Sequence, residues 1–467
     1  MHAETPRAID LVITGGVVIT VDAERRILLD GGIAVDGGRI VAVGRSAEVA
    51  AGFAPRRVID ALGGAVTPGF IDCHTHVSQH LGRGSIPDTW PEEREHDQWF
   101  PYWTNLRPED DDASTMLACL EMVRNGTTAF SDLGGRFEVE RKAAIVEAVG
   151  LRGVLSEIAW DRPPRPEVGT GDTDASLRVL ERAVAAVPFR GPGSHAWAGV
   201  SIPGMGTASE RLTIEAKALA GRHGLIFAMH QSFGDADTDR ARAEAGGRTP
   251  AEYLADLGLL DDRLQLIHMI RTQATEVPLL ARAGTRVVHC PAASLRVGMG
   301  VSRVGVFPEM VAAGVNVALG SDSGNYSDFY DVGRQMYLAA TIHREARGLM
   351  PTITAEQVVE MATINGARAI GAGEWLGSLE VGKQADLVIH RWNRPEWRPG
   401  VDPINSLVYS AQSVAVDTVI VGGEPILEGG HFTRVDEARE LARIDAAARG
   451  VNARSGFRIA HRWPVIA

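Results

Sequence analysis

The stretch GFIDCHTHVSQH, from Gly69 to His80, places two histidines two residues apart at the end of an apolar run. Residues i and i+2 of a β-strand face the same side, so the imidazoles of His74 and His76 are expected to point the same way. Cys73 faces the opposite side and is a poor ligand candidate. Two imidazoles on one strand face suit a divalent metal ion, provided that the fold brings further ligands to them.

Strand-like and helix-like segments alternate after this stretch. Apolar runs such as TTAFSD, GLIFAMH, LQLIHM and VNVALGSD each end in a polar residue, and helical patterns separate them. Eight such runs predict an α/β fold, a (β/α)8 TIM barrel, in residues 68–376. A doubly wound open sheet is the alternative, but the glycine-rich phosphate loop that it requires after the first strand is missing.

The two ends of the chain have a different sequence pattern. Residues 1–67 alternate β-branched residues with Gly- and Asp-rich turns, which is typical of antiparallel hairpins, and residues 377–434 share this pattern. We therefore predict a small β-sandwich that both ends build, with the barrel inserted between them. Residues 435–467 are expected to form a C-terminal helix and tail.

The composition indicates a globular protein in water, because 45% of the 467 residues are hydrophobic and 23% are charged. The formal net charge of −12 argues against nucleic acid and anionic membranes as partners. No apolar run reaches the roughly 20 residues of a membrane span, and no secretory signal opens the chain. Three scattered cysteines favour a reducing cytoplasm over a disulfide-bonded protein.

Metal-compatible side chains end four of the predicted strands at the same relative position. They are His74 and His76 on the first, His230 on the fifth, His268 on the sixth and Asp322 on the eighth. Active sites of such barrels lie at the carboxyl ends of the strands. His74, His76, His230 and Asp322 fit the ligand set of one divalent ion with an open position for water, zinc first, with iron and manganese as alternatives.

At this point the sequence resembles the amidohydrolase superfamily, in the branch of atrazine chlorohydrolase, guanine deaminase and S-adenosylhomocysteine deaminase. The motifs that carry the resemblance, in chain order, are TPGFIDCHTH, NGTTAFSD, IHM, VVHCPAASL, LGSDSG, TINGARAIG and GSLEVGKQADLVI. The resemblance implies a metal on His74, His76, His230 and Asp322, with His268 beside it. Dinuclear relatives need a lysine at a strand end; the three lysines lie elsewhere, which favours a single metal.

One position departs from the deaminases of this branch, which carry HxxE after the fifth strand. Here the segment reads His230-Gln231-Ser232-Phe233, so phenylalanine stands where the proton-shuttling glutamate is expected. Asp235 and Asp237 are close in sequence, but the sequence does not show their direction. Ring deamination needs an acid at the ring nitrogen, whereas a carbonyl substrate can be polarised by the metal and His268.

The preferred hypothesis is therefore a metal-dependent hydrolase that cleaves a C–N bond next to a carbonyl, of the amide, carbamate or urea type, as in the molinate and phenylurea hydrolases. The alternative is a deaminase or dechlorinase of an N-heteroaromatic ring, of the triazine, purine or pyrimidine type. A non-catalytic scaffold with the same fold is a remote third hypothesis.

Specific roles follow from the hydrolase hypothesis. Asp322 is the predicted general base and His268 the predicted donor to the developing oxyanion. Substrate contacts are expected from His80, Gln231, Phe233 and Asn325. An aromatic segment with Trp90, Trp99, Phe100, Tyr102 and Trp103 either covers the pocket or forms part of a homo-oligomer interface.

Overall fold

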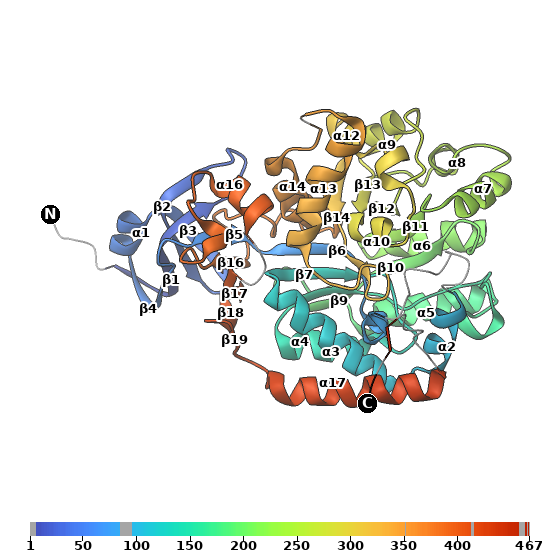
Figure 1. The fold of residues 1–467 in the computed structure, drawn as a ribbon, viewed down its shortest axis with the longest axis horizontal. Coiled ribbons are helices and arrows are strands. Elements are labelled where there is room, and N and C mark those ends of the chain that lie inside the picture. The colour runs from blue at the N-terminus through green and yellow to red at the C-terminus, as the bar shows by residue number, and fades with distance from the viewer. Residues whose placement is uncertain are drawn as a thin grey trace.

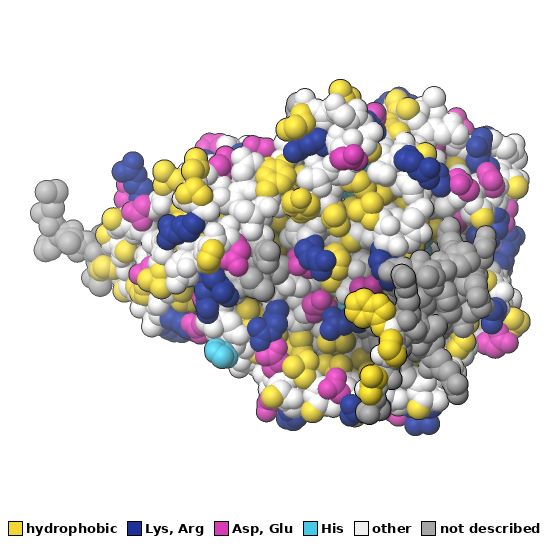
Figure 2. Space-filling model, viewed as in Figure 1, with side chains coloured by type: hydrophobic (Ala, Val, Ile, Leu, Met, Phe, Trp, Pro, Cys, Tyr) yellow, Lys and Arg dark blue, Asp and Glu magenta, His cyan; other side chains and the backbone are white. Residues whose placement is uncertain are grey.

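The computed structural model describes residues 6–84, 96–350, 352–411, 415–456, 463–464 and 466. The two chain ends meet in a sheet on one side of the molecule, and the middle of the chain forms the larger body on the other side (Figure 1). Lys and Arg side chains are interspersed with Asp and Glu on the face in Figure 2, so that face carries no patch of a single charge sign.

One sheet contains strands from both chain ends, as the sequence predicts. Its order is β19-β18-β17-β16-β5-β1-β2-β3, and β4 pairs with β1. The ends join where β5 and β16 run antiparallel, with Pro68 opposite Leu387 and Ala65 opposite His390. The strands are β1 (Arg7–Ile19), β2 (Ile27–Asp36), β3 (Arg39–Arg45), β4 (Phe53–Asp60), β5 (Ala65–Pro68), β16 (Leu387–His390), β17 (Val416–Val421), β18 (Glu424–Glu428) and β19 (His431–Phe432).

Two five-stranded parallel sheets form the larger body, with orders β10-β11-β12-β13-β14 and β15-β6-β7-β8-β9. One residue, Gly199, separates β9 from β10, and two residues separate β14 from β15. The strands are β6 (Phe70–His76), β7 (Thr127–Asp132), β8 (Arg152–Leu155), β9 (Ala196–Ala198), β10 (Val200–Gly204), β11 (Phe227–Gln231), β12 (Leu264–His268), β13 (Arg286–His289), β14 (Asn316–Leu319) and β15 (Asp322–Ser323).

Helices follow most of these parallel strands and cover them (Figure 1). They are α2 (His96–Asn105), α3 (Pro108–Arg124), α4 (Val139–Val149), α5 (Thr173–Ala186), α6 (Glu210–Arg222), α7 (Asp235–Glu244), α8 (Pro250–Asp256), α9 (Val277–Ala283), α10 (Pro291–Arg296), α11 (Val301–Val304), α12 (Phe307–Ala312), α13 (Val332–Arg347), α14 (Ala355–Ala362) and α15 (Ile364–Ala369). Three helices belong to the terminal segments: α1 (Ser46–Gly52), α16 (Pro403–Asn405) and α17 (Glu437–Ser455). The shorter turns are η1 (Val77–Gly82), η3 (Pro166–Val168), η4 (Pro395–Trp397) and η5 (Ser406–Ser410).

Local sequence signals set several helix ends. Asp172 caps α5 by accepting a hydrogen bond from the backbone N–H of Ala175, and Thr354 forms a capping box with Gln357 at the start of α14. Helix α4 ends at Gly150, whose backbone is left-handed. No helix in the described ranges combines the length and the apolar character that a membrane span requires.

The pairing of the parallel strands brings their carboxyl ends together. Asp322 pairs with Thr75 and Ser323 with His76, while Gln231 pairs with His268. Every residue of β6 is buried, which explains why this strand is almost continuously apolar up to its histidines. Within one sheet the ends of β6 and β15 therefore lie side by side, and within the other sheet those of β11 and β12 do.

Candidate metal centre

Four histidines and one aspartate come together from the ends of these strands. They are His74 and His76 on β6, His230 on β11, His268 on β12 and Asp322 at the start of β15. Ligand atoms of His74, His76 and His230 all lie within 4.8 Å of one another, and so do those of His74, His268 and Asp322. The five side chains that the sequence places at strand ends therefore converge.

The shortest distances join imidazole nitrogens to one another and to the carboxylate. Nε2 of His76 lies 3.3 Å from Nε2 of His230, and Nε2 of His74 lies 3.3 Å from Oδ1 of Asp322. Nε2 of His76 lies 3.7 Å from the same oxygen, and Nε2 of His268 lies 3.9 Å from Oδ2. Such a concentration of lone pairs around one point is the arrangement that a cation requires.

The imidazoles are oriented for this task. Nδ1 of His230 lies 2.9 Å from the carbonyl oxygen of Pro203 and donates to it, which leaves the lone pair on Nε2. Nε2 of His74 is buried and makes no hydrogen bond within the described residues. A buried nitrogen without a partner costs free energy, so a divalent ion in this position would satisfy it. The donor set fits zinc or a similar ion.

Burial keeps these histidines neutral. It lowers the pKa of His74 and His76 well below the ordinary value, and the neighbouring histidines add to the effect. Burial also lowers the pKa of His230, and it lowers the pKa of His268 to about 3. Neutral imidazole is the form that binds metal, so the four rings are ready for a ligand at neutral pH.

Two of these residues have unusual backbone conformations. His268 has φ 77° and Asp322 has φ 70°, in the left-handed region that non-glycine residues rarely adopt. Each such residue costs on the order of 1–3 kcal/mol, and such outliers gather at functional sites. His268 is the last residue of β12 and Asp322 is the first residue of β15, so each outlier lies at one end of a parallel strand.

Asp72, which the sequence reading did not single out, supports the centre from within β6. Its Oδ1 accepts a hydrogen bond of 2.9 Å from the backbone N–H of Ser321, next to Asp322. Burial raises the pKa of Asp72 to about 7, despite hydrogen bonds from Ser321 and the backbone of His74. The carboxyl group of Asp72 thereby ties β6 to the residue that precedes Asp322. Its position two residues before His74, on the same strand face, was the available signal.

Phe233 lies against the centre. Its ring meets the ring of His268 edge-on at a centroid distance of 5.8 Å and that of His230 at 6.4 Å. The residue that replaces the expected glutamate therefore presents an apolar edge to two of the converging histidines.

The other predicted substrate contacts have different surroundings. The ring of His80 bonds to the carboxylate of Glu121 and stacks on Tyr330 at 4.3 Å, so the structure does not bring it into the histidine cluster. Gln231 and Asn325 are buried, and side-chain atoms of both lack hydrogen-bond partners in the described part of the chain. Their role toward substrate stays a prediction.

The aromatic segment packs mainly on itself. Trp99 stacks on Trp103 at 5.2 Å and meets Trp160 edge-on at 6.2 Å, while the hydroxyl of Tyr102 donates to the carbonyl oxygen of Ser78. Trp90 lies outside the described residues. These contacts leave both predicted roles of the segment open.

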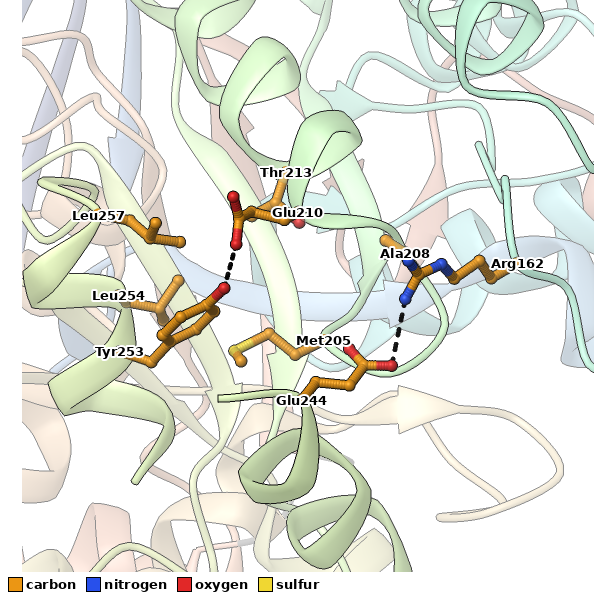
Figure 3. A pocket seen from close by; sticks show the side chains of 9 residues that line it. All are labelled: Arg162, Met205, Ala208, Glu210, Thr213, Glu244, Tyr253, Leu254 and Leu257. Carbon is orange, nitrogen blue, oxygen red and sulfur yellow. Dashed lines mark hydrogen bonds and ion pairs between the residues drawn. The ribbon is translucent and has the colours of Figure 1, made fainter. Parts of the chain in front are cut away.

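A separate cavity of about 220 Å³ lies between the loop after β10 and helices α6, α7 and α8 (Figure 3). Tyr253 donates to Glu210 on one side, and Arg162 pairs with Glu244 on the other. Met205, Ala208, Leu254 and Leu257 supply apolar walls. None of the five converging residues lines this cavity, so it is distinct from the candidate metal site.

Residues 65–426 match the model of the amidohydrolase family. The chain is 33% identical over 448 residues to the 5-methylthioadenosine/S-adenosylhomocysteine deaminase of Syntrophobacter fumaroxidans, covering 94% of this chain and 98% of that protein. A zinc-bound adenosine deaminase from Xanthomonas campestris superposes with a TM-score of 0.88 at 27% identity, over 96% of this chain and all of that one. Atrazine chlorohydrolase from Arthrobacter aurescens, solved with zinc, is similar in fold, with a TM-score of 0.84 at 24% identity over 94% of this chain and 100% of that one.

Proposed function

The chain belongs to the amidohydrolase family and is a hydrolytic enzyme acting on C–N bonds, and we propose that it is a zinc-dependent deaminase of an N-heteroaromatic ring. The ring class that we propose is the aminopurine of an adenosine-type nucleoside. The convergence of four neutral histidines and Asp322 at one strand edge carries the proposal, because it supplies the parts that hydrolysis needs.

The relatives change the order of the hypotheses that the sequence suggested. On the sequence alone, the absence of the glutamate three residues after His230 favoured an amide, carbamate or urea as the substrate, with ring deamination as the alternative. The relatives that cover nearly the whole chain are named as deaminases of adenosine compounds, and they support that alternative better than the amide hypothesis.

We propose that His74, His76, His230 and Asp322 hold one divalent ion. Two observations support this ligand set: Nε2 of His74 is buried without a hydrogen bond in the described residues, and Nδ1 of His230 donates to Pro203, which leaves the lone pair on Nε2. Zinc is the proposed ion because neutral nitrogen donors with one carboxylate suit it, and because two structural neighbours were solved with zinc. What such an ion supplies when bound is a water molecule whose pKa falls to roughly 7.

Asp322 is the proposed general base and acid. Its carboxylate lies among three imidazoles, where it can accept a proton from the attacking water and return it to the departing amine. His268 is neutral because burial lowers its pKa, so its N–H can donate to an oxygen that becomes negative. Asp322 thus moves the proton, and His268 stabilises charge.

Phe233 favours a second candidate, hydrolysis of an amide, carbamate or urea. No acid follows His230 at the expected spacing, and neither nearby aspartate takes its place. Asp235 is exposed and pairs with Arg271. Asp237 is buried, which raises its pKa to about 6, and it accepts hydrogen bonds from the backbone of Phe233 and Ser232. A carbonyl substrate would need no ring acid.

We further propose that the two parallel sheets form one closed (β/α)8 barrel over residues 68–376. The single-residue gap between β9 and β10 and the two-residue gap between β14 and β15 support it. An apolar cluster that includes Ile13, Ile33, Leu387 and Ile420 supports a terminal sheet folded into a sandwich. The homo-oligomeric state and the cytoplasmic location stay predictions.

Ammonia release tests the function. Purified protein with zinc is assayed on adenosine-type nucleosides, aminated triazines and pyrimidines, amides, carbamates and ureas. We expect ammonia and the corresponding oxo-purine from the nucleosides. Release of amine or acid from the carbonyl compounds, with no ammonia from any ring, would reverse the order of the two candidates.

A further inference from the structure

A buried ion pair lies beside the metal centre without taking part in it. Nζ of Lys142, on α4, is 2.6 Å from Oδ2 of Asp132, the last residue of β7. The side chains are 1% and 0% exposed, and lysine and aspartate are almost never buried to this extent without a partner. The pair therefore needs a structural or functional reason.

The hydrogen bond of the second carboxylate oxygen of Asp132 indicates what the buried pair does. Oδ1 accepts a hydrogen bond of 3.1 Å from the backbone N–H of Val77, the residue directly after His76. The backbone N–H of Leu133 donates to the carbonyl oxygen of Thr75 at 3.1 Å. The end of β7 is therefore hydrogen-bonded to the residue before His76 and to the residue after it.

The surroundings keep Lys142 charged and in place. Burial lowers the pKa of Lys142, but Asp132 and Asp111 outweigh it and the pKa is raised, so the ammonium group persists. Gly135 makes room for it, because a Cβ there would lie 2.2 Å from Nζ of Lys142 and 2.4 Å from Oγ of Ser78. No side chain larger than glycine fits at that position without moving the lysine.

The geometry points to Asp132, held by Lys142, as a positioning residue that sets the direction of the His76 imidazole toward the metal. This inference rests on the proposed role of His76 as a ligand. Lys142 holds one oxygen of Asp132, and the other oxygen fixes the peptide that follows His76. Partners that orient ligands in this way affect metal affinity about 10–100-fold when they are lost.

A pair of double variants isolates the contact to Val77. Lys142→Met with Asp132→Asn removes both charges but keeps an amide oxygen that can accept from Val77. Lys142→Met with Asp132→Leu removes the acceptor as well, at nearly the same side-chain volume. Zinc affinity is measured by competition with a chromophoric chelator, and the absorption spectrum of the cobalt(II)-loaded protein reports ligand geometry.

We expect zinc affinity to be about tenfold weaker in the leucine variant than in the asparagine variant, with an altered cobalt spectrum. Equal affinities and equal spectra would overturn the inference. Circular dichroism of the metal-free proteins checks that both fold. If the leucine variant does not fold, Lys142→Met with Asp132→Ala takes its place in the same comparison.

Lys217→Met is the matched control. Nζ of Lys217, on α6, bonds both oxygens of Asp261 at 2.6 and 2.7 Å, and neither residue is among the converging histidines and Asp322, so its loss should leave zinc affinity unchanged. Zinc binding by the wild-type protein distinguishes failure of the proposed metal function from failure of the positioning role. If it binds no zinc, the proposed metal function fails; if it binds zinc and the two double variants do not differ, only the positioning role fails.

Discussion

Nε2 of His74 lies 3.3 Å from Oδ1 of Asp322, although the two residues come from opposite ends of the middle segment. The contact exists because β15 pairs with β6, with Asp322 opposite Thr75. It places a carboxylate directly beside the imidazoles of the HxH pair. The carboxylate that we propose as the base therefore lies beside the imidazoles that we propose as metal ligands.

Asp322→Asn should leave the fold intact and remove nearly all turnover. An amide cannot accept the proton of the attacking water, and loss of such a general base costs about 10²–10⁴-fold in rate. Ammonia release at saturating zinc measures turnover, and circular dichroism checks the fold. Asp261→Asn, whose partner Lys217 lies on α6, is the control and should keep its rate. Near-normal turnover of the Asp322 variant would remove this residue from the base role.

Phe233→Glu should increase deamination of aminopurines by about 10²-fold, because it restores an acid three residues after His230. The Phe233 ring already lies against His230 and His268, so a carboxylate at this position starts beside the centre. The rate should also fall above the pKa of the new acid, where it no longer carries a proton. Phe233→Leu is the control and should show neither change. A glutamate variant with no gain would favour the carbonyl-substrate candidate.

The sequence predicted the features that depend on one strand at a time. A polar residue that ends an apolar run is visible without knowing the fold, so His230, His268 and Asp322 could be placed before their neighbours were known. The parallel order of β10 to β14 also follows from strand–helix alternation.

Contacts between elements could not be read in this way. The Lys142–Asp132 pair joins a helix to the preceding strand, and neither residue type alone indicates burial. His80 follows His76 by four residues, but it lies in the turn η1, and its ring bonds to the carboxylate of Glu121 on helix α3. Such outcomes depend on packing across the fold, which local patterns do not encode.

Metal removal should abolish turnover and lower stability. Dialysis against a chelator is expected to inactivate the enzyme, and zinc should restore it. Zinc at about 100 times its Kd should stabilise the fold by roughly 2.7 kcal/mol, which raises the unfolding midpoint of a chain of this length by about 3 °C. Differential scanning fluorimetry measures the shift. Calcium is the control, because it prefers oxygen ligands and should stabilise little. Equal stabilisation by calcium would argue against the histidine ligand set.

His390 supplies a test of pH-dependent stability away from the metal centre. Its ring is buried, with Nε2 3.3 Å from the hydroxyl of Thr67, and burial lowers its pKa from 6.5 to about 4. Above pH 6.5 the residue is neutral in both the folded and the unfolded chain and contributes no pH dependence. Between pH 6.5 and 4 the unfolded chain takes up a proton that the folded chain does not, so stability falls as the pH falls.

His390→Gln should reduce this loss, because the amide can still contact Thr67 but does not titrate. The wild type should lose up to about 3 kcal/mol more of its unfolding free energy than the variant between pH 6.5 and 4. Urea unfolding of both proteins with a chelator present measures the difference and keeps metal binding out of it. His431→Gln is the control: this side chain is exposed, so the slope should match the wild type. Parallel pH profiles for wild type and His390→Gln would show that the ring is protonated in the folded chain as readily as in the unfolded one.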